Sequence, residues 1–303
     1  MRLTGVQPGV GMRRPWTRLV GAIGGGFGTG LLLLISPTTS TGSPPLTDLL
    51  RKAGDLTVTL QGQLAVTVAQ EDYRQGLLLN LDRTPRVRRR IVSDVAWVPS
   101  LDAMVWAFFR DVVSVDGVPV TDRLGRLEGL FSSGITLDAR QRAARLLDEG
   151  ARYNLGRRRT VNTPTFCLAI LHPTNQHRFR FSAIGEDDID GIRVAKVRFS
   201  EVRRPTLTRT SNGADVPARG LLSIETVQGA LVASELDLPV VGLSAEIKVR
   251  FRPQGRQRLW LPVEMREVYG NHSASGERVE ATATYSSYRS AEVEIERFKV
   301  VPE

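Results

Sequence analysis

The feature that most constrains this chain is a two-residue alternation of apolar and polar side chains that recurs through its second half. Its clearest instance is residues 245–252, which read A-E-I-K-V-R-F-R and put Ala245, Ile247, Val249 and Phe251 on one face. A strict period of two predicts a β-strand with one buried and one solvated face. Such strands are typical of antiparallel sheets.

Similar segments, separated by turn residues, occur along most of the chain. Strands are predicted over residues 65–79, 86–98, 104–115, 177–183, 192–202, 221–226, 231–238, 245–252, 259–269, 278–288 and 293–300. Asp116-Gly117 and Asp190-Gly191 predict tight hairpin turns. The alternation slips near Ala195, which predicts a β-bulge, and Pro262 predicts an edge or bulged strand. The alternation indicates about nine to eleven strands joined as a meander.

Three segments show helical spacing instead. Apolar residues recur every three or four positions from Leu46 to Leu60 and over residues 135–154, and residues 164–171 form a short apolar run before Pro173. The predicted fold class is therefore α+β. We expect a single large antiparallel sheet that curls into a sandwich or a part-barrel, with helices on one face and a helical insert at about residues 135–171.

The N-terminal segment, residues 1–43, reads as a targeting sequence. Residues 19–36 carry no charge, four arginines precede them, and Pro37 ends the stretch. This pattern predicts either a signal peptide or a retained N-terminal membrane anchor. The protein is then exported to the periplasm or cell envelope, and residues 44–303 form one domain. Cys167 is the single cysteine, so no internal disulfide forms.

The net charge of +9 does not indicate a nucleic-acid partner. The arginines are spread along the strands at alternating positions, which is typical of the wet face of a sheet. A nucleic-acid site would concentrate them with aromatic residues on one element.

No motif indicates catalysis or a metal. The three histidines lack ligand spacing, Cys167 lies in an apolar run, and no nucleophile elbow occurs. Glu71 and Asp72 are adjacent on a predicted strand, so they point to opposite faces and do not form an acid–base pair. The acidic residues 186–190 predict a turn before a strand. We expect a non-enzymatic protein without cofactor or metal.

Several segments carry a family resemblance. They are AVTVAQEDYRQ (65–75), FRDVVSVDGVPVTDRLGRLEGLF (109–131), ARYNLGRRRTVNTPTFCLAILHPTNQHRFRF (151–181), RPTLTR (204–209) and LWLPVEMREVY (259–269). Together they resemble a group of uncharacterised bacterial exported proteins. The later half is similar to the outer-membrane lipoprotein carrier superfamily, LolA/LolB-like and MucB/RseB-type, through its helix-then-meander order and the W-x-P-x-E-M-R strand.

That resemblance implies an open half-barrel, capped by helices, whose hydrophobic cavity shields acyl chains, with no enzyme activity and no cofactor. The implied partner is a lipid or an acylated protein. An alternative is a structural, interaction or sensor module of the envelope that presents a strand edge to a peptide or protein. The apolar positions predicted to line the cavity, or else to pack as core beneath the helices, are Val197, Phe199, Leu236, Ile247, Val249, Phe251, Leu261, Val263 and Tyr285.

Overall fold

The computed structural model describes residues 45–65, 67–79, 82–99, 106–121, 150–156, 159, 161–210, 212–240, 243–270 and 276–290. All of them belong to the compact unit Gly42–Glu303. The predicted signal or anchor, the predicted strand over residues 293–300 and most of the helical insert lie outside these residues. Of the helix predicted over residues 135–154, residues 150–154 are described; residues 150–152 are helical and residues 153 and 154 are not. No helix in the described ranges is long and apolar enough to cross a membrane.

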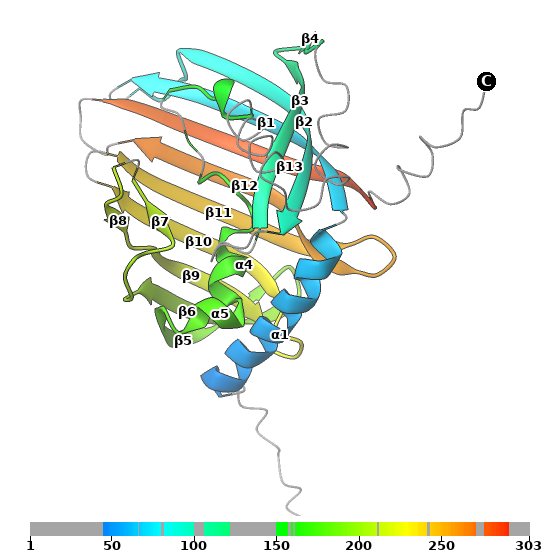
Figure 1. The fold of residues 1–303 in the computed structure, drawn as a ribbon, viewed down its shortest axis with the longest axis vertical. Helices are drawn as coiled ribbons and strands as arrows, with labels where there is room; N and C mark the ends of the chain where they lie inside the picture. Colours follow the sequence, from blue (N-terminus) through cyan, green and yellow to red (C-terminus); the bar gives the residue numbers. More distant parts are fainter. Residues whose placement is uncertain are drawn as a thin grey trace, which may run out of the picture. The chain divides into compact units, whose positions relative to one another are not determined.

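Eleven of the described strands form one antiparallel sheet, and two further short ones form a separate hairpin. The strands are β1 (Thr67–Leu79), β2 (Val87–Pro99), β3 (Trp106–Val115), β4 (Val118–Pro119), β5 (Phe179–Ile189), β6 (Ile192–Glu201), β7 (Thr208–Arg209), β8 (Asp215–Val216), β9 (Arg219–Glu225), β10 (Leu231–Val240), β11 (Leu243–Gln254), β12 (Leu259–Gly270) and β13 (Glu277–Ser290). Their order in the large sheet is β4-β3-β2-β1-β13-β12-β11-β10-β9-β6-β5 (Figure 1). The predicted strand number and antiparallel meander are confirmed.

Two meanders meet where the first strand pairs with the last. β1 lies against β13 with Tyr73 opposite Ala283, so strands from both ends of the sequence form the middle of the sheet. The ends of the order, β4 and β5, do not pair with each other. The described sheet is therefore open, as predicted for a half-barrel.

The sheet curls strongly at its β3 end. Strands β2 and β1 separate β3 from β13, so in a flat sheet those two strands would lie about 14 Å apart. The ring centroids of Phe108 on β3 and Tyr285 on β13 are only 6.4 Å apart. Figure 1 accordingly shows β2 and β3 crossing in front of their neighbours. The predicted curvature is confirmed.

Both predicted irregularities occur, one of them on a different strand. The partner of β11 changes from Glu264, opposite Arg250, to Pro262, opposite Phe251, so Val263 has no partner across the ladder. This confirms a bulge beside Pro262. The bulge predicted near Ala195 lies instead on the neighbouring strand β5, where the register shifts between Ala183 and Gly185. The prediction of its strand was wrong: Val194 and Ala195 are both buried in an unbroken strand, so the slip in alternation does not mark an extra residue of β6.

The acidic segment before Asp190 is strand, not turn. β5 continues to Ile189, beyond the end predicted at residue 183. Its acidic side chains pair across the hairpin with basic ones of β6: Glu186 with Arg193 at 2.5 Å and Asp187 with Lys196 at 3.2 Å. Opposite charges across strands stabilise a ladder that the composition alone does not favour.

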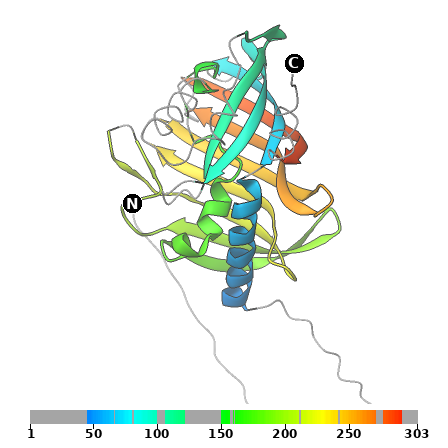
Figure 2. The same cartoon turned by 45° about the vertical axis from the view of Figure 1, so that its right-hand side comes forward.

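Three described helices cover one face of the sheet: α1 (Leu46–Leu64), α4 (Phe166–Leu171) and α5 (Pro173–Gln176). Both views show them in front of the same face (Figure 1, Figure 2). Leu49, Ala53 and Leu60 of α1 are buried, and so are all residues of α4. The helices predicted at Leu46 and over residues 164–171 are thus confirmed, although Pro173 also begins the short α5.

The outward face of the sheet is wet. Ion pairs join neighbouring strands across it, including Lys248–Glu235 at 2.8 Å and Arg219–Asp237 at 2.6 Å, with substantially exposed side chains. Such exposed pairs contribute about 0–1 kcal/mol each. The distribution of arginines along the sequence is explained by this face.

Candidate binding site

The inward face of the sheet divides into two regions of different chemistry. The apolar half consists of β6, β9, β10 and β11 beneath the helices, with Val197, Phe199, Leu222, Ile247 and Phe251 in its core. The polar half consists of β1, β2, β3, β12 and β13, and its inward residues include charged and phenolic side chains.

Glu71 and Arg110 form a buried ion pair in the polar half. Nε and Nη2 of Arg110 donate to the two carboxylate oxygens of Glu71 at 2.6 and 3.0 Å, and Nη2 also donates to the carbonyl of Asn162 at 2.8 Å. Burial disfavours the charged guanidinium, but the Glu71 carboxylate keeps the pKa of Arg110 above its ordinary value. Asp72 points outward to Arg90. The expected opposite orientation of Glu71 and Asp72 is confirmed.

A second buried carboxylate, Glu267, lies in the same half. The hydroxyls of Tyr73 and Tyr269 donate to it at 2.6 and 2.9 Å. Nη2 of Arg159 donates to the Tyr73 hydroxyl at 3.2 Å and to Oε1 of Gln75 at 2.8 Å. Burial raises the pKa of Glu267, and the Tyr73 hydrogen bond and nearby guanidinium charges partly oppose that rise.

These groups fit a structural role better than a catalytic one. Each of the two carboxylates already accepts hydrogen bonds from side chains that hold it in place. Cys167 is buried, and burial raises the pKa of its thiol to about 12, so it is a poor nucleophile. Within the described ranges, no three His, Cys, Asp or Glu side chains gather to hold a metal ion.

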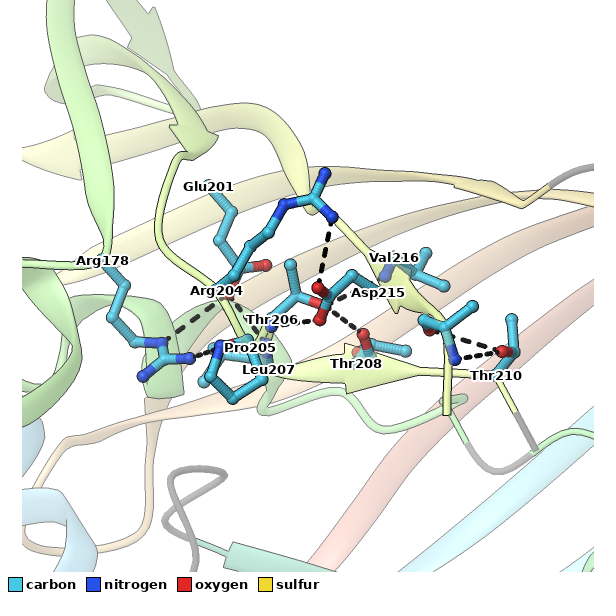
Figure 3. Close-up of polar contacts among 11 residues, drawn as sticks. Arg178, Glu201, Arg204, Pro205, Thr206, Leu207, Thr208, Thr210, Asp215 and Val216 are labelled. Carbon is cyan, nitrogen blue, oxygen red and sulfur yellow. Dashed lines mark hydrogen bonds and ion pairs between the residues drawn. The ribbon is translucent and has the colours of Figure 1, made fainter. Parts of the chain in front are cut away.

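A further polar cluster fixes the connection between β6 and β9 (Figure 3). The Glu201 carboxylate accepts from the backbone N–H of Leu207 at 2.8 Å and of Ala218 at 3.2 Å. Asp215 accepts from the backbone N–H and the hydroxyl of Thr206. These contacts bind the chain to itself, so the segment that includes RPTLTR acts as a structural clamp.

The apolar half contains a pocket of about 260 Å³, here named the α1 pocket. Helix α1, helix α4 and the turns that follow β9 and β11 surround it. Its lining residues are Ala53, Leu56, Thr57, Thr59, Leu60, Gln63, Leu168, Gln228, Gly229, Leu231, Gln257, Arg258, Leu259 and Trp260.

Close contact between α1 and the β9–β10 turn forms one side of this pocket. Gly229 has φ +84°, and a Cβ there would lie 2.7 Å from the backbone nitrogen of Ala53, so only glycine fits. Nζ of Lys52 donates to the carbonyl of Val227 at 3.0 Å. The turn is thereby fixed against the helix, and Leu231 follows it into the buried floor.

The floor of the pocket is continuous with the core. Leu60, Leu168 and Leu231 belong to the same buried cluster as the apolar strand residues. Trp260 packs against that cluster and remains half-buried. The pocket is thus an opening between the helices and the sheet, with an aromatic wall.

The residues predicted to line a cavity lie elsewhere. Eight of them belong to the buried core cluster: Val197, Phe199, Leu236, Ile247, Val249, Phe251, Leu261 and Tyr285. Val263 is half-buried at the bulge of β12 and lies outside the cluster. None of the nine lines the α1 pocket. Ligand contact by these residues stays a prediction.

The sequence did not predict the α1 pocket or the buried polar groups around Glu71 and Glu267. Four of the fourteen lining residues, Gln228, Gly229, Gln257 and Arg258, lie in turns, which have no periodicity to read. The buried polar groups around Glu71 and Glu267 left a weak signal in the sequence, because Glu71, Tyr73 and Gln75 share one phase of the β1 alternation. That phase places Glu71 on the inward face, but not beside Arg110.

No protein-family model matches the sequence, and no curated protein does. Among solved structures, a putative outer membrane lipoprotein-sorting protein domain from Vibrio parahaemolyticus is 8% identical, with 80% of this chain and 93% of that chain covered and a TM-score of 0.37. A DUF1329 family protein from Desulfovibrio piger is 9% identical (80% and 92% covered, TM-score 0.34). A LolA superfamily protein from Nitrosomonas europaea is 11% identical (80% and 92%, TM-score 0.31).

The superfamily that the sequence resembles is therefore among the similar solved structures. At TM-scores and identities this low, those structures carry no information about the ligand or partner of this chain. Its function has to be inferred from its own geometry.

Proposed function

We propose that the chain is a non-enzymatic cell-envelope protein that binds a lipid, a free acyl chain or the acyl group of a lipoprotein. The supporting observation is the α1 pocket, whose floor is formed by Leu60, Leu168 and Leu231 and whose wall is Trp260. Half of its fourteen lining residues are apolar, and a small-molecule site combines apolar lining with polar groups that fix the orientation of the ligand.

The size of the pocket suits part of one acyl chain. Its volume of about 260 Å³ lies just below the range of about 300–1,000 Å³ for sites that take drug-sized ligands. Each methylene that leaves water contributes about 0.8 kcal/mol. A guest chain is therefore held reversibly, as a carrier requires.

A longer chain would reach the sequence-predicted residues. Leu231 and Leu168 belong to the same cluster as Ile247, Val249 and Phe251, so outward movement of α1 would extend the pocket along them. We propose those residues as the inner wall of the enlarged cavity.

Export to the envelope is proposed from the N-terminal segment. The absence of enzyme activity is proposed because, in the described part of the chain, the buried carboxylates are engaged and the thiol is not activated. The guest would then be bound and released unchanged.

A second candidate is an interaction or sensor module that binds a peptide or protein. Strand β5 ends the sheet order, so one of its edges faces no other strand among those described. An extended peptide could add to that edge through backbone hydrogen bonds.

Native mass spectrometry of the purified full chain, followed by organic extraction, separates the two candidates. The matched variants are Leu56→Trp, which fills the α1 pocket, and Val58→Trp, which adds the same side chain at an exposed position of the same helix. We expect an extractable acyl compound on the wild type and on Val58→Trp, and much less on Leu56→Trp.

Purification could remove a bound lipid, so the same proteins are then titrated with decanol as an added guest. Equal decanol binding by Leu56→Trp and Val58→Trp would contradict the pocket assignment. A wild-type protein that binds neither lipid nor decanol, but binds an extended peptide, would favour the interaction module.

A further inference from the structure

The lining of the α1 pocket carries a positive charge and no negative charge. Of its fourteen lining residues, Arg258 alone is charged, and none is acidic. A site for a purely apolar guest needs no cation, so Arg258 requires a separate explanation.

Arg258 and its neighbour Arg256 have no carboxylate partner. Both lie exposed in the turn between β11 and β12, and neither side chain makes an ion pair or hydrogen bond within the described part of the chain. On the same two strands, Arg252 pairs with Asp190 and Arg266 with Glu264, whereas exposed Arg250 has no such partner among the described residues.

The acidic side chains nearest in sequence to the pocket residues of α1 and of the β9–β10 turn, Asp55 and Glu225, are already engaged. Asp55 on α1 pairs with Arg51 at 3.2 Å. The Glu225 carboxylate accepts from the backbone N–H groups of Val227 and Gln228 at 2.7 and 2.6 Å. Among the described residues, no carboxylate therefore neutralises the cation at the pocket mouth.

The backbone of Arg258 is also unusual. Its φ of +52° lies in the left-handed region, which glycine and asparagine occupy more readily than arginine. Such a conformation costs about 1 kcal/mol or more, and the hairpin turn between β11 and β12 holds it in place.

From these observations we infer that the guest is an amphiphile with an anionic headgroup, carboxylate or phosphate, which Arg258 binds at the mouth of the pocket. This inference rests on the proposed function, since it assumes that the apolar part of the guest lies against Leu60, Leu168 and Trp260. A guanidinium suits the headgroup because its planar donors match carboxylate and phosphate oxygens in pairs.

Calorimetric titration with decanoate and with decanol tests the inference, because the two guests share a chain and differ in charge. The wild type should bind decanoate about fivefold more tightly at low salt, as for a partly exposed ion pair. This advantage should shrink as salt is added. In Arg258→Gln, decanoate should bind no more tightly than decanol, and Arg258→Lys should restore part of the preference.

The matched control is Arg203→Gln, which removes another exposed arginine, on the β6–β9 connection and away from the pocket. It should leave both affinities unchanged. Decyl phosphate and inorganic phosphate are titrated in parallel. Tight binding of inorganic phosphate alone would show a simple anion site and overturn the inference.

The possible results distinguish failure of the headgroup inference from failure of the proposed acyl-chain binding. If decanol and decanoate bind equally well to the wild type and to Arg258→Gln, the headgroup inference is wrong while the acyl-chain pocket stands. If neither guest binds, the proposed function fails and the headgroup inference fails with it.

Discussion

The two halves of the inward face are covered in different ways. In the polar half the sheet curls over itself, so β3 lies near β13. The two surfaces that face each other there belong to the same hydrogen-bonded sheet. In the apolar half helices cover the strands and contact them through side chains, and α1 also packs against β1 and β2 of the polar half. The polar half is held together by buried ion pairs and hydrogen bonds as well as aromatic contact, whereas the helices contact the apolar half mainly through apolar side chains.

This difference indicates which half can open. Buried charges such as Glu71 and Arg110 have to keep their geometry, because either one left unpaired in the interior is costly. Apolar contacts around Leu60 and Leu168 can be exchanged for contacts with an acyl chain at little net cost. The polar half is therefore the fixed scaffold, and the helix-covered half is the one suited to a guest.

The largest effect is expected from breaking the buried ion pair. Arg110→Met leaves the Glu71 carboxylate buried without its partner, which should lower the free energy of unfolding by about 3–5 kcal/mol in urea titrations. The double variant Glu71→Leu/Arg110→Met removes both charges and should recover most of that loss. A loss below about 1 kcal/mol for Arg110→Met would mean that the polar half is not a rigid scaffold.

The next effect concerns the close contact between α1 and the β9–β10 turn. Gly229→Ala places a Cβ against Ala53 at a positive φ, and Gly213→Ala has the same φ of +84° with open space around it. We expect Gly213→Ala to cost about 1 kcal/mol and Gly229→Ala about 1–2 kcal/mol more, measured by thermal unfolding. Equal losses would show that the turn does not hold α1 in place.

A smaller effect is expected from trimming the apolar core. Ile247→Val removes one buried methylene and should lower the free energy of unfolding by about 1 kcal/mol. The next residue, Lys248, points outward and pairs with Glu235. Lys248→Ala should lower the free energy of unfolding by less, about 0–1 kcal/mol. If Lys248→Ala destabilised the protein more than Ile247→Val, burial would not dominate this half.

The smallest effect is a pH dependence that arises from Glu267. Burial raises its pKa in the folded protein above the ordinary 4.5, so the folded state binds the proton more tightly than the unfolded state. The free energy of unfolding should therefore fall as pH rises from 4.5 through the folded pKa. Comparing urea titrations of the wild type and Glu267→Gln isolates this slope, and identical slopes would contradict the assignment.

Local sequence patterns predicted most of the strands and their turns. Alternation over residues 245–252 matches the burial of β11, and Asp116-Gly117 has positive φ at both residues, as its hairpin requires. Alternation gives the face of each side chain but not which strands meet across long stretches of sequence. The pairing of β1 with β13 is of that long-range kind.

The functional geometry was harder to predict because it depends on that pairing and on turns. Glu71 and Arg110 come together only after β3 curls toward β13, and no local pattern contains that curl. Gly229 and Arg258 contribute to the α1 pocket from turns, whose positions follow from where the strands end. Predicted cavity residues such as Ile247 were placed correctly on the inward face, where the structure buries them as core.

The most direct test of the account is where an acyl chain binds. Bromine atoms on a fatty acid quench the fluorescence of a tryptophan that they touch, and Trp260 lines the α1 pocket whereas Trp97 and Trp106 are buried in the polar half. Titration with bromodecanoate should quench the wild type and leave the remaining emission of Trp260→Phe nearly unchanged. Equal fractional quenching of both proteins, or none in either, would contradict a guest in the helix-covered half.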